Sequence, residues 1–370
     1  MSDSRLFKPL QIGNNTLQHR VVMAPLTRFR VQDHTHVPLP FVKEYYAQRA
    51  STPGTLLITE ATFISKAAGG YSNAPGIWSS EQIEAWKEVT SAVHAKGSFI
   101  WLQLWAHGRA AGKDVAEAEG FTVKAPSAIP MGPGEVVPEE MSHEDIQTFI
   151  GYYAQAAKNS IEAGFDGVEI HGANGYLIDQ FVRDGSNQRT DEYGGSVENR
   201  SRFALEVTKA VVDAVGADKV GIRLSPFNPY QGMSATDPVG QFGHLIKELS
   251  KFKLAYLHFV ESLYNERAED PETSDFALEA WGNTSPILLA SGFTPAKAKE
   301  IVENHKDKDI AIVFGRHFLA NPDLPFRISK DLALNEYNRD TFYLIGKPEG
   351  YTDYPFSQEF LNLQASQVVA

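Results

Sequence analysis

Eight short apolar runs recur along the chain, and most of them are followed by a segment with helical features. A run that is apolar almost throughout is typical of a strand buried on both faces, as in a parallel sheet. Strand and helix alternating eight times favours an α/β fold of the closed (β/α)8 or TIM-barrel type over an open doubly wound sheet. The expected strands are residues 21–26, 54–59, 98–104, 165–170, 220–224, 256–260, 286–290 and 310–314.

Capping residues mark where several of the intervening helices should begin. Ser79 and Gln82 have the spacing of a capping box, and Ser142 stands before another run with helical periodicity. Thr294 is followed by a proline, the expected order for an N-cap and the first helical residue. By the same reasoning, a further helix is expected to open at residues 321–322.

No composition shift or proline-rich linker divides the chain, so we expect a single domain over residues 1–370. Two connections are expected to be long loops. Residues 106–140 are rich in glycine, proline and alanine, and residues 261–280 are acidic and carry no motif that identifies a ligand. The second loop is expected to cap the mouth of the barrel and to contact the substrate.

Composition narrows the class of protein and of partner. The chain has 370 residues, 42% of them hydrophobic, no cysteine and a net charge of −12. Disulfides and thiolate sites are therefore excluded, and no metal site is expected. An acidic chain without a basic stripe is unsuited to nucleic acid or anionic membranes. The chain also has no bilayer-length apolar run and a polar start, so we expect a soluble, cytoplasmic protein that acts on a small molecule.

Glycines follow the last two expected strands, at a place where barrels of this kind commonly bind phosphate. Gly292 follows the seventh strand, and Gly315 and Arg316 follow the eighth. Backbone N–H groups at a following helix N-terminus would face the phosphate, and Arg316 would add a forked cation. The alternative is that both glycines only make tight turns between strand and helix.

Three other polar residues end strands and should share the same mouth. Taken singly, Thr27 could cap a turn, Gln103 could be a satisfied polar group of the barrel, and Arg223 could belong to a structural ion pair. Their expected common location is what favours a binding role.

The sequence His-Gly-Ala-Asn-Gly-Tyr, residues 171–176, follows the fourth expected strand. His171, Asn174 and Tyr176 are neutral hydrogen-bonding groups at or near pH 7, and the two glycines let the backbone bend between them. Such a cluster is suited to binding a polar, uncharged group and transferring a proton to it. The alternatives are a structural histidine and a rim tyrosine whose hydroxyl faces water.

Several longer motifs indicate a family. They are Met-Ala-Pro-Leu-Thr-Arg at 23–28, His-Gly-Ala-Asn-Gly-Tyr-Leu-Ile-Asp-Gln-Phe at 171–181, Asn-Gln-Arg-Thr-Asp-Glu-Tyr-Gly-Gly-Ser at 187–196, Phe-Gly-Arg at 314–316 and Asn-Pro-Asp-Leu-Pro at 321–325. With these motifs the chain resembles the old yellow enzyme family of flavin-dependent ene-reductases, and most of all its fungal members. The resemblance extends from residue 6 to residue 355.

The resemblance implies a non-covalent FMN cofactor and NADPH as the reductant. It implies that Thr27 hydrogen-bonds the carbonyl edge of the flavin, Gln103 binds its pyrimidine edge, and Arg223 lies where negative charge gathers on reduction. The implied cofactor-binding residues are Pro25, Leu26, Thr27, Ala61, Gln103 and Arg223 around the flavin, with Gly292, Gly315 and Arg316 at its phosphate. Many relatives have glycine where this chain has Ala61. The alanine adds a methyl group beside the flavin ring.

The resemblance also assigns the substrate side. His171 and Asn174 would bind the substrate carbonyl oxygen, Tyr176 would be the proton donor, Tyr343 would cover the substrate, and Trp105 would shape the pocket. The implied function is reduction of the activated C=C bond of α,β-unsaturated aldehydes and ketones, and tyrosine at 176 favours reduction over isomerisation.

Alternatives to a general ene-reductase remain at this stage. One is a pathway-specific fungal alkaloid aldehyde reductase of the same family. A second is a cofactor-free barrel lyase or aldolase, which would need a lysine or a metal site that the expected strand ends lack. A third is a flavin-binding sensor without turnover. The sequence is compatible with a monomer or a homodimer, and with NADH in place of NADPH.

Overall fold

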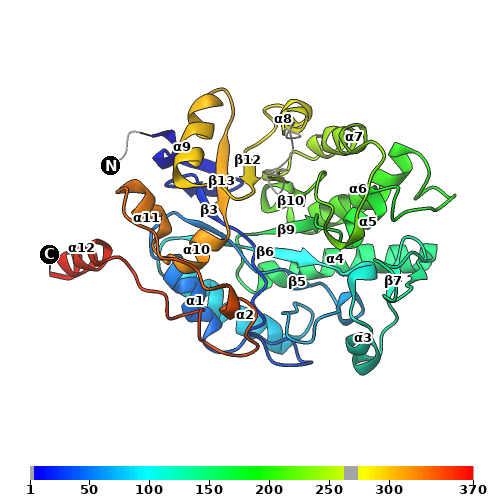
Figure 1. Ribbon diagram of the computed structural model, residues 1–370, viewed down its shortest axis with the longest axis horizontal. Coiled ribbons are helices and arrows are strands. Elements are labelled where there is room, and N and C mark those ends of the chain that lie inside the picture. The colour runs from blue at the N-terminus through cyan, green and yellow to red at the C-terminus, as the bar shows by residue number, and fades with distance from the viewer. Residues whose placement is uncertain (1–3, 262–273, 370) are drawn as a thin grey trace.

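Eight parallel strands close into a barrel in the computed structural model, which describes residues 4–261 and 274–369 (Figure 1). Around the barrel the order is β4-β3-β13-β12-β11-β10-β9-β6, and β6 pairs with β4 to close it. The strands are β3 (Val21–Met23), β4 (Leu56–Ile58), β6 (Phe99–Trp105), β9 (Gly167–Gly172), β10 (Val220–Leu224), β11 (Tyr256–Val260), β12 (Ile287–Ala290) and β13 (Ile310–Phe314). The predicted (β/α)8 barrel is confirmed.

Helices surround the strands, and α12 projects away from the barrel at the C-terminal end of the chain (Figure 1). They are α1 (Val42–Arg49), α2 (Ser80–His94), α3 (Lys113–Glu119), α4 (His143–Glu162), α5 (Leu177–Val182), α6 (Val197–Val215), α7 (Pro238–Ser250), α8 (Asp275–Trp281), α9 (Pro295–Asn304), α10 (Arg316–Ala320), α11 (Leu324–Ser329) and α12 (Gln358–Val369). The short strands outside the barrel order are β1 (Leu10–Ile12), β2 (Asn15–Leu17), β5 (Thr62–Phe63), β7 (Lys124–Ala125) and β8 (Glu139–Glu140).

The capping predictions are confirmed at three helices and wrong at one. Ser79 and Gln82 form the capping box of α2, and Ser142 and Thr294 cap α4 and α9. No helix opens at residues 321–322, because Asn321 ends α10 instead: its side chain donates to a carbonyl of that helix and accepts from the backbone N–H of residue 335. Helix α11 begins only at Leu324.

The two predicted long loops contain regular structure. Residues 106–140 include α3 and a parallel pairing of β7 with β8. Within residues 261–280, the part from 275 onward belongs to α8, because Ala277, Leu278 and Trp281 recur at helical spacing and are buried. Residues 262–273 of the predicted capping loop lie outside the described residues.

Alternation along the strands separates a core outside the barrel from a filling inside it. Val168 and Ile170 of β9 belong to the core that packs against the outer helices. Inside the barrel, a Cβ atom on Gly167 would meet the ring of Trp101, and one on Gly221 would meet the ring of Tyr256. These two rings lie 5.1 Å apart and fill the barrel below the mouth. The inward positions between these rings and the carboxyl-terminal mouth carry polar residues.

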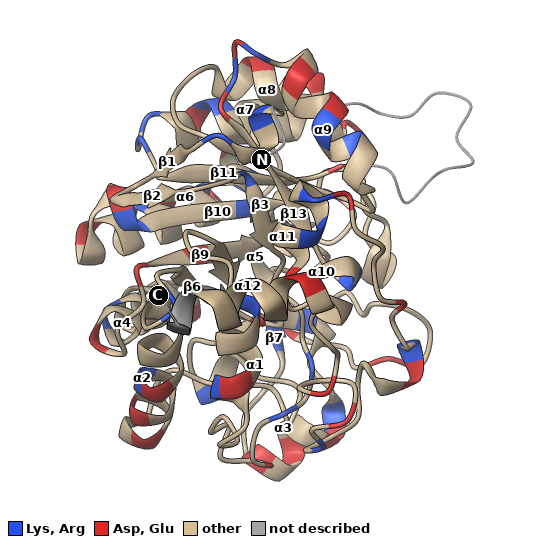
Figure 2. Ribbon diagram, turned by 90° about the vertical axis from the view of Figure 1, so that its left-hand side faces the viewer, with Lys and Arg blue, Asp and Glu red and all other residues tan. Residues whose placement is uncertain are grey.

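Charged residues of both signs are interspersed on the outer helices, for example on α2 and α9 (Figure 2). Within the described residues, no helix combines the length and the apolarity that crossing a bilayer requires.

Candidate active site

Polar side chains from four neighbouring strands meet at the carboxyl-terminal mouth of the barrel. In the strand register, Gln103 of β6 is opposite Glu169 of β9. Arg223 of β10 is opposite His171 of β9 on one side and His258 of β11 on the other. The structure thus brings together three predicted residues and adds Glu169 and His258, which the sequence analysis did not single out.

The backbone of the loop after β9 is bent into an unusual conformation and fixed by hydrogen bonds. Asn174 and Gly175 have φ values of 58° and 78°. The Asn174 N–H donates to Ser225 Oγ at 2.7 Å, and the Gly175 N–H donates to Asp179 Oδ2 at 2.8 Å. A side chain at Gly175 would also press on Met233, so glycine is required there for two reasons. The loop therefore presents its side chains in one defined arrangement.

His171 is buried and neutral, and its hydrogen bonding determines which ring nitrogen carries the proton. Burial, with the nearby Arg223 charge as a further cause, holds the pKa of His171 well below its usual value of 6.5. The backbone N–H of Ala173 donates to Nδ1 at 3.3 Å. Nδ1 is therefore the acceptor, and the proton of the neutral ring lies on Nε2. His171 can donate one hydrogen bond from Nε2.

The carboxamide of Asn174 is oriented by a neighbour. Asn228 donates to Asn174 Oδ1 at 2.9 Å, so the oxygen faces Asn228 and the amino group faces away from it. Among residues 4–261 and 274–369, that amino group donates no hydrogen bond. Asn174 is half-buried and has two N–H donors available for a ligand.

Tyr176 lies beside His171 in an aromatic cluster. Its ring is edge-on to His171 at 5.0 Å and to Trp105 at 4.9 Å. Only 8% of the residue is exposed, and burial raises the pKa of its hydroxyl above the usual value of 10. Tyr176 is therefore a protonated phenol over the whole physiological pH range.

His107 belongs to the same cluster but was not predicted. It is fully buried, and burial lowers its pKa to about 3. Its ring stacks on Tyr176 at 5.2 Å and is edge-on to Trp105 at 4.2 Å and to Tyr71 at 4.5 Å. It followed the third expected strand at the start of a predicted loop, where no pattern distinguishes a buried histidine from an exposed one.

The other predicted residues near the barrel axis lie at the ends of β3 and β4. Pro25 and Ala61 are buried, and Leu26 and Thr27 are half-buried. A Cβ atom on Gly315 would be 3.4 Å from Leu26 Cδ2, so the turn after β13 lies directly beside the end of β3. Ala61 shares an apolar cluster with Trp105 and Tyr176.

The two predicted phosphate-binding turns differ in how much open space they have. Gly292 is exposed, has a φ of 63°, and has no atom within 4 Å of the position of a Cβ atom. Gly315 precedes the first residue of α10, and Arg316 is exposed. The Arg316 guanidinium contacts Tyr337, to whose hydroxyl it donates at 3.3 Å.

Tyr343 is connected to the aromatic cluster of the site through Phe29 and Tyr71. It is 62% exposed, its ring lies 5.6 Å from Phe29, and Phe29 is edge-on to Tyr71 at 5.3 Å. The backbone just before Tyr343 is fixed, because Arg28 and Arg30 both donate to the carbonyl of Phe342 at 2.9 Å. Tyr343 therefore lies on the rim, on the side of Tyr71.

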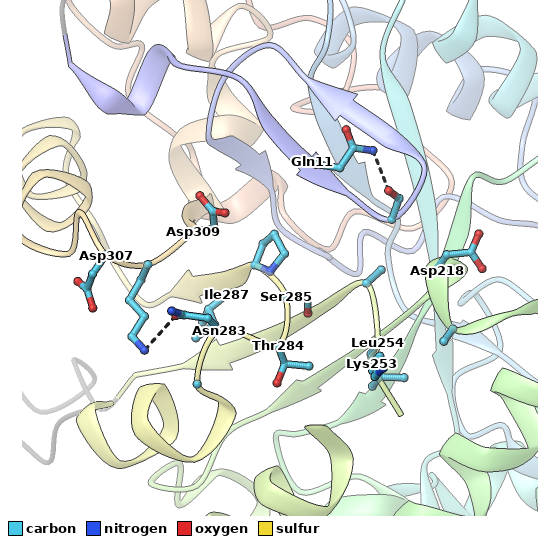
Figure 3. Close-up of a pocket in the computed structure, with 16 residues that line it drawn as sticks. Gln11, Asp218, Lys253, Leu254, Asn283, Thr284, Ser285, Ile287, Asp307 and Asp309 are labelled. Carbon is cyan, nitrogen blue, oxygen red and sulfur yellow. Dashed lines mark hydrogen bonds between the residues drawn. The ribbon is translucent and has the colours of Figure 1, made fainter. Parts of the chain in front are cut away.

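A cavity of about 780 Å³ lies at the opposite, amino-terminal end of the barrel strands (Figure 3). It is lined by the connections that lead into β10, β11, β12 and β13. Asp309, which lines the cavity, forms an ion pair with Arg20 at 3.3 Å, and Lys308 donates to the neutral Asn283 at 3.2 Å. None of the predicted residues lines it, so the candidate site is the mouth, where barrel enzymes place their chemistry.

Comparison with known proteins identifies the family. Residues 5–335 match the model of the NADH:flavin oxidoreductase / NADH oxidase family. The structure matches an old yellow enzyme from Pichia sp. AKU4542 with a TM-score of 0.89 and 39% identity, covering 97% of this chain and 95% of that chain. The chain belongs to the old yellow enzyme family of FMN oxidoreductases. The family resemblance inferred from the sequence motifs is confirmed.

Curated fungal members of the old yellow enzyme family are similar over almost their full length. A protein of Epichloe festucae var. lolii named "Probable inactive reductase easA" is 53% identical, covering 100% of both chains. "NADP-dependent oxidoreductase lnbE" of Aspergillus flavus is 52% identical over 97% of this chain and 98% of that protein. "Chanoclavine-I aldehyde reductase fgaOx3" of Penicillium roqueforti is 52% identical over 96% and 98%.

The mouth has the features that FMN, the cofactor of the old yellow enzyme family, requires. Arg223 Nε and His258 Nε2 are buried there without a hydrogen-bond partner among the described residues, as is Trp105 Nε1. Native structures leave few such atoms unpaired unless a ligand or water completes them. The glycine turn after β12 has open space for the phosphate end, and the turn after β13 leads into the N-terminus of α10. These residues fit a polar, planar, phosphate-bearing ligand.

Proposed function

We propose that this chain is an ene-reductase that uses FMN and NADPH to reduce the activated C=C bond of α,β-unsaturated aldehydes and ketones. The observation that carries the proposal is the loop after β9. It presents two neutral N–H donors, His171 Nε2 and the amino group of Asn174, next to the protonated phenol of Tyr176.

Each of these groups has one role in conjugate reduction. Negative charge grows on the carbonyl oxygen as the β carbon is reduced, and donors already aimed at that oxygen stabilise the charge. His171 and Asn174 are these donors. The α carbon then needs a proton, which Tyr176 holds in a pocket lined by Trp105 and His107. FMN, when bound, supplies the hydride.

The remaining predicted residues would hold the cofactor and close the site. Gln103 and Arg223 would bind the pyrimidine end of the flavin, beside Thr27, Pro25, Leu26 and Ala61. Gly292, Gly315 and Arg316 would bind its phosphate. Tyr343 would cover the substrate from the rim. NADPH as reductant is supported by the NADP-dependent relative from Aspergillus flavus.

Aldehydes are the favoured carbonyl class, because similar fungal proteins are named aldehyde reductases, "Chanoclavine-I aldehyde reductase fgaOx3" and "Aldehyde reductase FrzD". A flavin-binding protein without turnover is the second candidate, since the relative from Epichloe festucae is named inactive. The donors and the buried phenol of the loop favour the reductase.

A two-step colour assay tests the proposal. Purified protein with FMN is expected to be yellow, to bleach when NADPH is added without oxygen, and to regain its colour when an enone such as cyclohexenone follows. A protein that binds no FMN would contradict the proposal outright. Bleaching without recovery, tested also with an unsaturated aldehyde, would favour the flavin-binding protein without turnover.

The enone step is expected to be independent of pH between about pH 6 and pH 9. His171 must be neutral and Tyr176 protonated for the proposed roles. The pKa of His171 lies well below 6.5 and that of Tyr176 lies above 10, so neither group titrates in this window. Mixing pre-reduced protein with enone in a stopped-flow instrument measures this step without the NADPH step. A rate that falls as the pH is lowered, with a midpoint near pH 6.5, would show that a histidine of ordinary pKa limits the enone step.

A further inference from the structure

A carboxylate lies inside the barrel below the site, and the mechanism above does not use it. Glu169 is fully buried and occupies the inward position of β9 next below His171. A buried charged group is costly unless partners compensate it, and buried ionisable groups often serve a nearby site.

Three side chains from two other strands, β6 and β11, bind this carboxylate. Gln103 of β6 donates from Nε2 to Glu169 Oε1 at 2.6 Å. The Tyr256 hydroxyl of β11 donates to Oε2 at 3.0 Å, and His258 Nδ1 lies 2.8 Å from the same oxygen. Arg223 of β10 adds an electrostatic attraction. The carboxylate is the centre of the polar layer at the mouth.

These partners keep Glu169 charged. Burial alone would raise its pKa, but the hydrogen bond from His258, the charge of Arg223 and the hydrogen bond from Gln103 bring the pKa below its usual value. His258 itself is neutral, because burial lowers its pKa despite the carboxylate. The single ring proton of His258 is therefore on Nδ1, donated to Glu169.

The negative charge of Glu169 fixes the orientation of the Gln103 carboxamide. A carboxylate can only accept hydrogen bonds, so the Gln103 atom that contacts it must be the amino nitrogen. The Gln103 oxygen is then left as an acceptor for a ligand. The pyrimidine edge of a flavin carries one N–H between two carbonyl oxygens, and the N–H needs such an acceptor.

The same charge offsets that of Arg223. Arg223 is half-buried at the mouth, and its guanidinium stays positive in proteins. Arg223 lies opposite His171 on the neighbouring strand, two residues beyond Glu169, and the carboxylate exerts the largest attraction on its guanidinium. The positive potential that a reduced, negatively charged flavin would meet at the mouth is therefore smaller than that of Arg223 alone.

We propose that Glu169 is a positioning residue for FMN: it sets the orientation of the Gln103 amide for flavin binding, and it lowers the reduction potential of the bound flavin by offsetting Arg223. The inference rests on the proposed placement of FMN over Gln103 and Arg223.

Glu169→Gln separates this role from a structural one, with the midpoint potential and the dissociation constant of FMN as readouts. Loss of the negative charge is expected to favour reduced over oxidised flavin by at least tenfold, which is about 30 mV upward for a two-electron couple. FMN affinity is expected to fall severalfold, because an amide at 169 accepts either orientation of Gln103. Glu119→Gln is the matched control, since Glu119 is also buried and bound to a histidine (His36, 3.2 Å) but lies outside the mouth. The control is expected to change neither quantity.

Tyr256→Phe provides a second variant of opposite sign, which is useful if Glu169→Gln does not fold. It removes one donor from the carboxylate, leaves more of its negative charge uncompensated, and is expected to lower the potential. Unchanged potentials in the folded variants would overturn the inference. Arg223→Gln then tells which premise failed: if it alters FMN affinity or potential, only the role of Glu169 is wrong, and if it alters neither, the placement of FMN is wrong as well.

Discussion

Tyr176→Phe is expected to slow the enone half-reaction by about 10²–10⁴-fold, the usual contribution of a positioned general acid. The substitution removes the only group in the loop after β9 that is assigned to deliver a proton to the α carbon. Reduction of the flavin by NADPH needs no such proton and should keep its rate. Separate stopped-flow measurements of the two half-reactions check the expectation.

The phenylalanine keeps the packing of Tyr176 against Trp105 and His107, so the lost atom is the hydroxyl alone. Tyr153→Phe is a matched control, because Tyr153 of α4 is a buried tyrosine in the core whose hydroxyl has no partner among the described residues. It is expected to leave both half-reactions unchanged. An equal loss in both half-reactions of Tyr176→Phe would show that Tyr176 is not the proton donor.

The sequence was sufficient to predict the barrel because its strands are buried on both faces and therefore read as continuous apolar runs. The sequence also indicated the loop after β9 as a candidate site, because three hydrogen-bonding side chains directly after such a run have few structural uses. Glu169 was overlooked although it interrupts one of these runs. Counting inward positions backward from His171 in steps of two reaches Glu169, so alternation is a signal that could have found it.

Other parts of the site depend on contacts between distant segments. Tyr71 and Tyr176, which pack on His107 and help to bury it, are separated by about a hundred residues of sequence. The position of Tyr343 depends on Arg28 and Arg30, whose guanidinium groups bind backbone carbonyls some 310 residues further along the chain. Backbone carbonyls carry no residue-specific pattern, so the partners of these arginines cannot be predicted from a single sequence.

Combining His171→Ala with Asn174→Ala is expected to weaken the binding of a phenol by about 10²–10⁴-fold. The oxygen of a bound phenolate imitates the negatively charged oxygen that conjugate reduction creates. Each variant residue supplies a hydrogen bond to a charged acceptor, worth about 1.5–3 kcal/mol, and two such bonds account for this range. Titration of the FMN-loaded protein with phenol, followed by absorbance, measures the affinity.

The variant Asn228→Ala makes the test more specific. Asn228 does not belong to the proposed donor pair but holds the Asn174 oxygen at 2.9 Å. Without it, the carboxamide can turn its oxygen toward the ligand, so phenol affinity should fall by less than in the double variant while FMN binding stays unchanged. If the double variant retained its phenol affinity with FMN still bound, the loop after β9 would not be the oxyanion site. The proposed reaction would then lack the donors that stabilise the charge on the substrate oxygen, and the assignment of His171 and Asn174 would fail.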